Sequence, residues 1–195
     1  MGELENWTEY GSISRDLPIA KTDRELIEYY KAGERVIRLE AGNLCRTLGG
    51  RGYMKTANRD EGTICSVDLG RVTCDDLNEY FVSHCVIRRH RLVPKGFLIM
   101  NAEWYKERRV APRAHPSDGK LNMIKSSLDF RQFVFAYQKS RSGDHLPHPN
   151  LRMQIIKDHV LSFPSPMLVA VDGVAIGRFS EIDIAIEHLA VKVVV

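Results

Sequence analysis

Carboxylates next to glycine are the residues of this chain whose types and spacing could carry chemistry. Asp172 precedes Gly173 between two apolar runs, and Asp118 precedes Gly119. A carboxylate held at such a turn can accept a proton as a general base or bind a hard cation. The same Asp-Gly pairs also form tight turns, because glycine tolerates positive φ and aspartate bonds to its own backbone. For Asp172 the turn is the favoured interpretation, and Asp68 is expected to point outward from a strand.

A second candidate site lies where Gly42 is followed by Asn43 and Arg46. If a short helix begins here, its free N–H groups could bind an anion such as a nucleotide phosphate. Glu40 brings a carboxylate close to the place that such a phosphate would occupy. A packed turn between a strand and a helix is therefore favoured, and nucleotide binding by Asn43 and Arg46 is the alternative.

Basic residues are concentrated between residues 84 and 115. This stretch holds eight lysines and arginines against two glutamates, and Trp104 and Tyr105 lie within it. It could attract anionic lipid head groups or nucleic-acid phosphates, or it could form a solvated rim. The rim is favoured, lipid contact comes second, and nucleic acid is disfavoured because no nucleic-acid-binding motif accompanies the block. The candidate lipid- or anion-binding residues are Arg88, Arg89, Arg91, Lys95, Arg108 and Arg109.

Short apolar segments divided by Pro, Gly and Asp turns must position these residues. Helices are expected near residues 22–32, where Thr22 and Glu25 form a capping box, and near 43–48 and 127–139. Strands are expected at residues 35–39, 63–69, 79–87, 97–102, 120–125, 151–163, 167–171, 178–186 and 190–195. This pattern predicts a mainly β fold, an antiparallel two-layer β-sandwich with two or three short helices.

Length and composition fit one globular domain with an arm. The chain has 195 residues, 44% of them hydrophobic, which suffices for one core. Residues 1–16 are expected to lack regular structure. We expect an N-terminal arm and short helix over residues 1–33 and the sandwich domain over residues 34–195. The four cysteines lack C-x-x-C spacing, and no signal segment or long apolar run is present. These features favour a cytoplasmic protein, peripheral at the membrane if the basic block binds lipid.

Five short motifs follow one another along the chain. Residues 42–49 read GNLCRTLG, 67–72 read VDLGRV, 111–121 read APRAHPSDGKL, 143–149 read GDHLPHP and 171–173 read VDG. In this order they resemble the diacylglycerol kinase and sphingosine kinase family of lipid kinases. The resemblance covers residues 37–195 and implies the family's second, lipid-side domain, which is a two-layer β-sandwich. It also implies a nucleotide beside Asn43 and Arg46, and a structural cation held by Asp118 and a backbone carbonyl, here that of Leu121.

The chain departs from this family at positions that phosphoryl transfer requires. The family's ATP-binding half carries Gly-Gly-Asp-Gly-Thr, whose amides hold phosphates, and this sequence has no such run. The family's Asp-Gly-Glu reads Asp172-Gly173-Val174, so the general-base glutamate is replaced and Asp172 is the remaining catalytic candidate. Ser117 replaces one of the family's cation-binding aspartates. Phosphoryl transfer needs a phosphate cradle, Mg²⁺ and a positioned base, and this chain supplies only parts of that set.

Three functions follow as hypotheses. The favoured one is a lipid-kinase-like domain without autonomous kinase activity that binds lipid head groups or a partner subunit. The first alternative is a split or degenerate diacylglycerol-type kinase that transfers phosphate from ATP together with a second chain. The second alternative is an anion- or nucleic-acid-binding module built on the basic block. The expected partners are an anionic membrane surface and an ATP-binding chain, and Mg²⁺ is the cofactor that a cation site would take.

Overall fold

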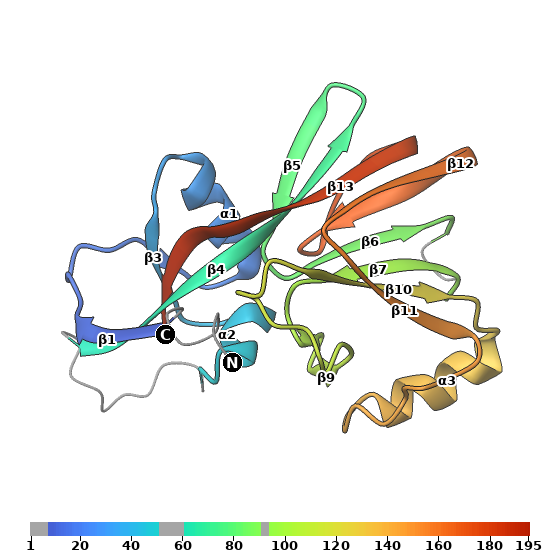
Figure 1. The fold of residues 1–195 in the computed structure, drawn as a ribbon, viewed down its shortest axis with the longest axis horizontal. Helices are drawn as coiled ribbons and strands as arrows, with labels where there is room; N and C mark the ends of the chain where they lie inside the picture. Colours follow the sequence, from blue (N-terminus) through green and yellow to red (C-terminus); the bar gives the residue numbers. More distant parts are fainter. Residues whose placement is uncertain (1–7, 51–60, 91–93) are drawn as a thin grey trace.

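The computed structural model describes residues 8–50, 61–90 and 94–195 and consists mainly of strands (Figure 1). The three helices are α1 (Asp23–Lys31), α2 (Asn43–Thr47) and α3 (Phe130–Lys139). The strands are β1 (Thr8–Ser12), β2 (Ile19–Ala20), β3 (Val36–Leu39), β4 (Glu61–Cys74), β5 (Leu77–Phe81), β6 (His84–Arg88), β7 (Gly96–Met100), β8 (Trp104–Tyr105), β9 (Arg108–Arg109), β10 (Leu121–Ser126), β11 (Leu151–Ile156), β12 (Asp158–Val171) and β13 (Val174–Val194). The predicted mainly β class is confirmed, and the helices lie within the three predicted ranges.

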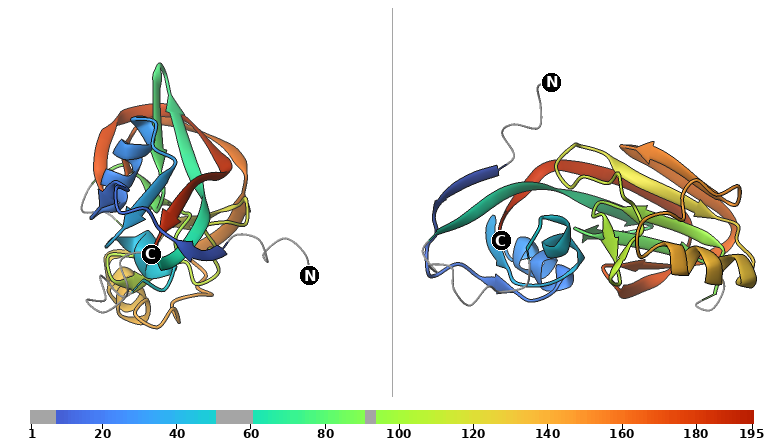
Figure 2. Two further views of the ribbon diagram at one scale, coloured as in Figure 1. Left: turned by 90° about the vertical axis from the view of Figure 1, so that its left-hand side faces the viewer. Right: turned by 90° about the horizontal axis from the view of Figure 1, so that it is seen from below.

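Eleven of the described strands join into one sheet. Its main order is β1-β4-β13-β12-β6-β7-β10-β11, with β5 paired to β4, and with β3 and β2 added beside β13. The pairing is antiparallel except between β13 and β3 and between β3 and β2, which are parallel. Side chains from strands far apart in this order, such as Val72 of β4 and Leu121 of β10, share one core. The two predicted layers are therefore parts of one continuous sheet, which curves so that distant parts of it pack against each other (Figure 2).

A second core lies beneath α1, at the end of the sheet that contains β3. Leu26 and Ile27 of α1 pack there with Ile37 of β3, Val67 of β4 and Val193 of β13. The predicted boundary between residues 33 and 34 falls in the short connection between α1 and β3. Side chains from both sides of that boundary share this core, so α1 is placed firmly against the sheet.

The strand boundaries differ from the prediction where long strands tolerate irregularities. The predicted segments 151–163 and 167–171 are redivided into β11 and a 14-residue β12, which continues through Pro164 and Pro166. Proline can lie within β12 because its register with β13 shifts between Ser162 and Met167, where ladder hydrogen bonds are interrupted. Similarly, β13 is one 21-residue strand with a register shift between Glu187 and Val191.

The N-terminal region also departs from the prediction. Residues 1–16 were expected to lack regular structure, yet Thr8–Ser12 form β1, which pairs with β4. The Thr22 cap of α1 is confirmed, since Thr22 Oγ1 accepts the Glu25 N–H at 3.1 Å. The predicted capping box is incomplete, because the Glu25 carboxylate accepts the Lys21 N–H at 2.6 Å and not that of Thr22. Within the ranges that the structure describes, no helix is long and apolar enough to cross a bilayer.

We expect Gly70→Ala to destabilise the fold by about 1–3 kcal/mol through overpacking. Gly70 of β4 pairs directly with Phe81 of β5, and a Cβ at residue 70 would lie 2.1 Å from the Phe81 ring. Urea unfolding measures the change. Gly11→Ala in β1 is the matched control, because a Cβ there meets nothing within 4 Å. Equal stability of the two variants would contradict this account of the β4–β5 contact.

Candidate functional site

Asp172 lies in the two-residue turn between β12 and β13, and its carboxylate is buried. Asp172 and Gly173 have φ values of 43° and 88°, as a tight hairpin turn requires. The Asp172 carboxylate accepts the N–H groups of Val82 at 2.8 Å and Ser83 at 3.0 Å, which connect β5 to β6, and that of His84 at 3.0 Å, the first residue of β6. Its side chain has no exposed surface. These bonds clamp the hairpin turn to the start of β6.

A second buried carboxylate, which the sequence did not reveal as a site residue, faces the same region. Asp23 is the first residue of α1, and it accepts the N–H groups of Asn43 at 2.9 Å and Leu44 at 3.1 Å. Gly42 precedes them at a φ of 114°, and a Cβ there would lie 2.4 Å from Asp23 Oδ1. The first two amides of α2, where the sequence suggested a nucleotide phosphate, therefore bind this chain's own carboxylate.

The two carboxylates affect each other's protonation. Burial raises the pKa of Asp172 to about 7, the nearby charge of Asp23 adds to this rise, and the three N–H bonds oppose it. Burial likewise raises the pKa of Asp23, against the N–H bonds from Asn43 and Leu44. Two like charges in a shared low-dielectric space favour retention of a proton by the pair. The pair thus titrates as a unit at higher pH than ordinary aspartates.

His84 lies beside this pair but carries no charge at neutral pH. Burial and, to a smaller extent, the Lys106 charge lower the pKa of His84 to about 4. Its Nδ1 is 3.1 Å from Ser83 Oγ and 3.7 Å from Asp172 Oδ1, and its ring meets the Tyr105 ring edge-on at 4.6 Å. The imidazole therefore packs as a neutral side chain and supplies no positive charge for an anionic substrate.

Asp68 is fully buried, so the prediction that it points outward is wrong. Its carboxylate accepts the N–H groups of Gly119 and Leu189 at 2.7 Å each and contacts His188 Nδ1 at 2.7 Å. The loop that ends at Gly119 and the bulge of β13 cover this part of β4. Strand periodicity could not reveal that cover, because both covering segments are distant in the sequence.

The predicted cation site at Asp118 and Leu121 lies next to Asp68. Asp118 is half-buried, its Oδ1 accepts the Lys120 N–H at 3.0 Å, and burial raises the pKa of its carboxyl. Leu121 is buried at the start of β10, opposite Ile156 of β11. Among the residues outside the gaps at 1–7, 51–60 and 91–93, no group of three acidic, histidine or cysteine side chains could hold a metal. The cation remains a prediction.

The two residues of the predicted nucleotide contact, Asn43 and Arg46, contact β8 and the turn that follows it. Asn43 Oδ1 accepts the Lys106 N–H at 3.1 Å. The Arg46 guanidinium stacks 5.1 Å from the centre of the Trp104 ring. Both side chains thus hold α2 against β8.

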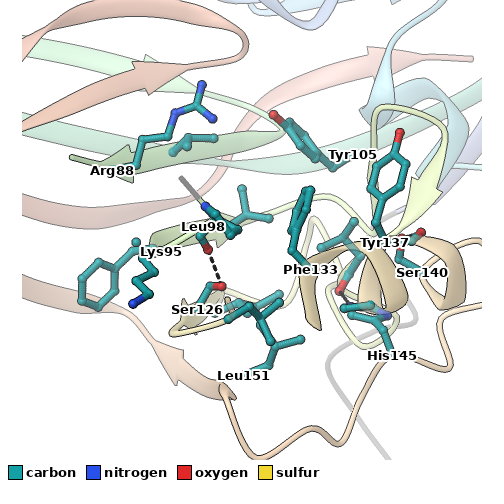
Figure 3. A pocket seen from close by; sticks show the side chains of 18 of the residues that line it. Arg88, Lys95, Leu98, Tyr105, Ser126, Phe133, Tyr137, Ser140, His145 and Leu151 are labelled. Atoms are coloured by element: carbon teal, nitrogen blue, oxygen red, sulfur yellow. Dashed lines mark hydrogen bonds between the residues drawn. The ribbon is translucent and has the colours of Figure 1, made fainter. Parts of the chain in front are cut away.

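Three of the six predicted anion-binding residues meet at one cavity of about 460 Å³ (Figure 3). Arg88, Lys95 and Arg108 line it together with Lys106. Arg109 pairs with Glu103, and Arg89 is exposed, with its carbonyl accepting Arg178 Nη1. Arg91 lies outside the described residues.

The cavity lies between strands β6, β7 and β10 and helix α3, and its wall is mostly apolar. Leu98, Ile124 and Leu151 come from the sheet, and Phe133 and Tyr137 come from α3. No aspartate or glutamate is among the described residues that line it. The sequence suggested the basic part of this site but not the apolar part. The four-residue spacing of Phe133 and Tyr137 places both on one face of a helix. It does not predict which strands that face covers.

We expect the free energy of unfolding to fall more steeply with rising pH in the wild type than in Asp23→Asn, between about pH 4 and 7. The carboxyl pKa of Asp172 rises from 3.8 to about 7 on folding. The folded chain therefore holds a proton that the unfolded chain releases, and stability falls as pH rises through this window. Removing the Asp23 charge lowers the pKa of Asp172, and each unit removed reduces the fall by about 1.4 kcal/mol.

Urea unfolding at several pH values measures this difference. Asp75→Asn is the matched control, because Asp75 also sits in a strand turn at positive φ, 50°, but is exposed. It should keep the pH dependence of the wild type. The same pH dependence in Asp23→Asn and the wild type would show that the two carboxylates titrate independently.

Comparisons with known proteins found similarity in fold but not in sequence. No family model and no curated protein matches the sequence. Three similar solved structures come from Bacillus anthracis str. Sterne. One is described as a diacylglycerol kinase, with a TM-score of 0.54 and 11% identity over 82% of this chain and 66% of that one. Two others carry the provisional description of diacylglycerol kinase, with TM-scores of 0.62 and 0.57 and 10% identity.

The shared region covers most of this chain but only part of those proteins. The two provisional kinases match over 92% and 82% of this chain and over 78% and 68% of their own lengths. Against the first structure, the chain spans slightly less than two thirds of the other protein's length. At 10 to 11% identity the similarity concerns the arrangement of the backbone and not the chemistry. The chain has the fold of bacterial diacylglycerol kinase-like proteins.

Proposed function

We propose that this chain is a lipid-binding domain of diacylglycerol kinase-like fold without autonomous phosphotransferase activity. The observation that carries the proposal is the cavity beneath α3, which joins an apolar wall to four basic side chains. We infer that the wall takes the hydrocarbon part of a lipid and that the basic side chains take an anionic head group. We also propose that this chain corresponds to the lipid-side half of such kinases and lacks their ATP-binding half.

The size and wall of the cavity suit a hydrocarbon chain. A volume of about 460 Å³ falls within the range of about 300–1,000 Å³ of ligand pockets. Each methylene transferred from water to an apolar wall contributes about 0.8 kcal/mol. Leu98, Ile124, Phe133 and Leu151 offer such a wall, whereas a nucleotide would require many more polar partners.

The charges around the cavity favour an anionic head group. Arg88, Lys95, Lys106 and Arg108 line it without an acidic side chain among the described lining residues. Arg108 is fixed in place, because its guanidinium lies 3.5 Å from the centre of the Tyr137 ring and donates to the Tyr137 carbonyl. Arginine and lysine side chains form charge-assisted hydrogen bonds with phosphate oxygens. A phosphate-bearing lipid would thus supply the negative charge that the lining of the cavity lacks.

The arrangement of the acidic residues supports the absence of autonomous kinase activity. The Asp172 carboxylate is fully buried and accepts three N–H groups, so a lipid hydroxyl has no access to it as a base. The residue two positions later is Val174, which has no group to accept a proton. Asp23 occupies the amides at the start of α2. Phosphoryl transfer needs groups that are free to contact phosphate.

We expect Leu98→Trp to weaken binding of a fluorescent short-chain phosphatidic acid at least about tenfold, which corresponds to 1.4 kcal/mol. The larger side chain fills the cavity, and fluorescence anisotropy below the lipid's micelle-forming concentration measures the affinity. Ile155→Trp is the matched control, because Ile155 is exposed on β11 and does not line the cavity. Ala136→Phe is a second filling variant if Leu98→Trp fails to fold.

A second pair of substitutions tests whether the basic side chains bind the anionic head group. Lys95→Ala/Arg108→Ala should weaken binding of phosphatidic acid more than binding of the uncharged diacylglycerol of the same chain length. If both filling variants fold and bind phosphatidic acid with wild-type affinity, the lipid does not bind in the cavity and the proposal is wrong. Equal losses for both lipids would remove the head-group contact.

We expect no transfer of phosphate above background when the chain is incubated with labelled ATP, Mg²⁺ and diacylglycerol. The reason is the engaged Asp172 together with Val174, and thin-layer separation of the labelled lipid is the measurement. Turnover that disappears in Asp172→Ala would contradict the proposal. Transfer that arises only after a Gly-Gly-Asp-Gly-Thr chain is added would instead identify a split kinase.

A further inference from the structure

Helix α3 exposes an unusual number of large apolar side chains. Of its ten residues only Ala136 is buried, while Phe130 is 72% and Phe135 is 58% exposed. Phe133, Val134 and Tyr137 are also exposed, by 39% to 48%. A helix on the surface of a globular protein usually places such residues against the core. This aromatic surface therefore calls for a partner outside the chain.

The aromatic surface is continuous with the cavity. Phe133 and Tyr137 both line the cavity and remain partly exposed, and their rings stack at 5.8 Å (Figure 3). Anything that covers the outer face of α3 would thus lie at the edge of the cavity. This continuity ties the partner of α3 to the proposed ligand.

The charged residues around α3 are predominantly basic. Arg131 and Lys139 lie on the helix, Arg141 follows it, and Arg108 stacks on Tyr137. The acidic neighbours are occupied within the chain, since Asp129 caps the helix through the Gln132 N–H and Asp144 accepts the Ser142 hydroxyl. Protein interfaces are depleted in lysine, which α3 carries at Lys139, although they accept arginine. Aromatic and basic residues on one short helix match the interface of an anionic bilayer.

We propose that α3 docks this domain on anionic bilayers by inserting its exposed aromatic side chains at the level of the head groups. The inference rests on the proposed function in one respect, namely that the bound lipid comes from the same bilayer. The basic side chains of the helix and of the cavity would contact anionic head groups in the surrounding leaflet. The helix would thereby hold the edge of the cavity at the membrane.

Vesicle sedimentation with the full chain tests the proposal. Phe130→Ser/Phe135→Ser should reduce binding to vesicles of phosphatidylcholine mixed with phosphatidylserine at least about tenfold. The reason is the loss of two aromatic side chains that would be buried in the bilayer on docking. Neither side chain lines the cavity, so binding of monomeric phosphatidic acid should stay at the wild-type level. Tyr10→Ser is the matched control, because Tyr10 is 73% exposed on β1, at the opposite end of the molecule from α3 (Figures 1 and 2). It should keep vesicle binding.

The outcomes separate this inference from the proposed function. Loss of vesicle binding in the double variant but not in Leu98→Trp supports docking through α3, whether or not the cavity takes a lipid. Full vesicle binding by the folded double variant overturns the inference, even if the cavity binds lipid. Equal binding to vesicles of phosphatidylcholine alone would overturn the anionic requirement. A concentration-dependent dimer that the double variant abolishes, without any vesicle binding, would assign the surface to a second copy of the chain.

Discussion

The Asp172 carboxylate is the contact on which the centre of this structure depends. It holds the three successive N–H groups of Val82, Ser83 and His84, and so fixes the β12–β13 turn to the start of β6. Asp23 does the same for the start of α2. A buried N–H group without an acceptor would lower the stability of the fold by about 1–3 kcal/mol. These two side chains supply the acceptors that a neighbouring strand or helical turn would otherwise provide. The cost is two like charges in one buried space, which raises the carboxyl pKa of both aspartates.

Asp68 of β4 repeats this arrangement. Its carboxylate joins Gly119 and Leu189, two residues with positive φ that lie in a loop and in the bulge of β13. Such conformations leave N–H groups that no strand can pair, and a buried carboxylate with two acceptor oxygens satisfies them. The fold thus uses three aspartates, Asp23, Asp68 and Asp172, as internal connectors between segments that are distant in the sequence. Among the described residues, the charged side chains that line the cavity are basic.

The sequence predicted what local patterns determine and missed what distant segments determine. Caps and apolar spacing located all three helices, and the Asp172-Gly173 turn followed from backbone preferences. Strand periodicity failed for Asp68 because it carries no information about the loop that covers β4. Proline within β12 was taken to separate strands, although a register shift accommodates it. The Asp23–Asp172 pair and the apolar wall of the cavity depend on which elements pack together, and no local pattern encodes that choice.

The motifs that resemble lipid kinases therefore report on architecture more than on chemistry. In this chain, the Asp-Gly of the last motif supplies positive φ for a hairpin and an acceptor for three amides, and neither role requires catalysis. The Gly-Asn of the first motif lets the chain approach Asp23 closely, because a Cβ at Gly42 would overlap that carboxylate. A residue that serves backbone geometry is needed by the fold whether or not the protein is active, so its presence does not imply function. Evidence for function has to come from surfaces that the fold itself does not need, and here those are the cavity with its basic side chains and the exposed aromatic face of α3.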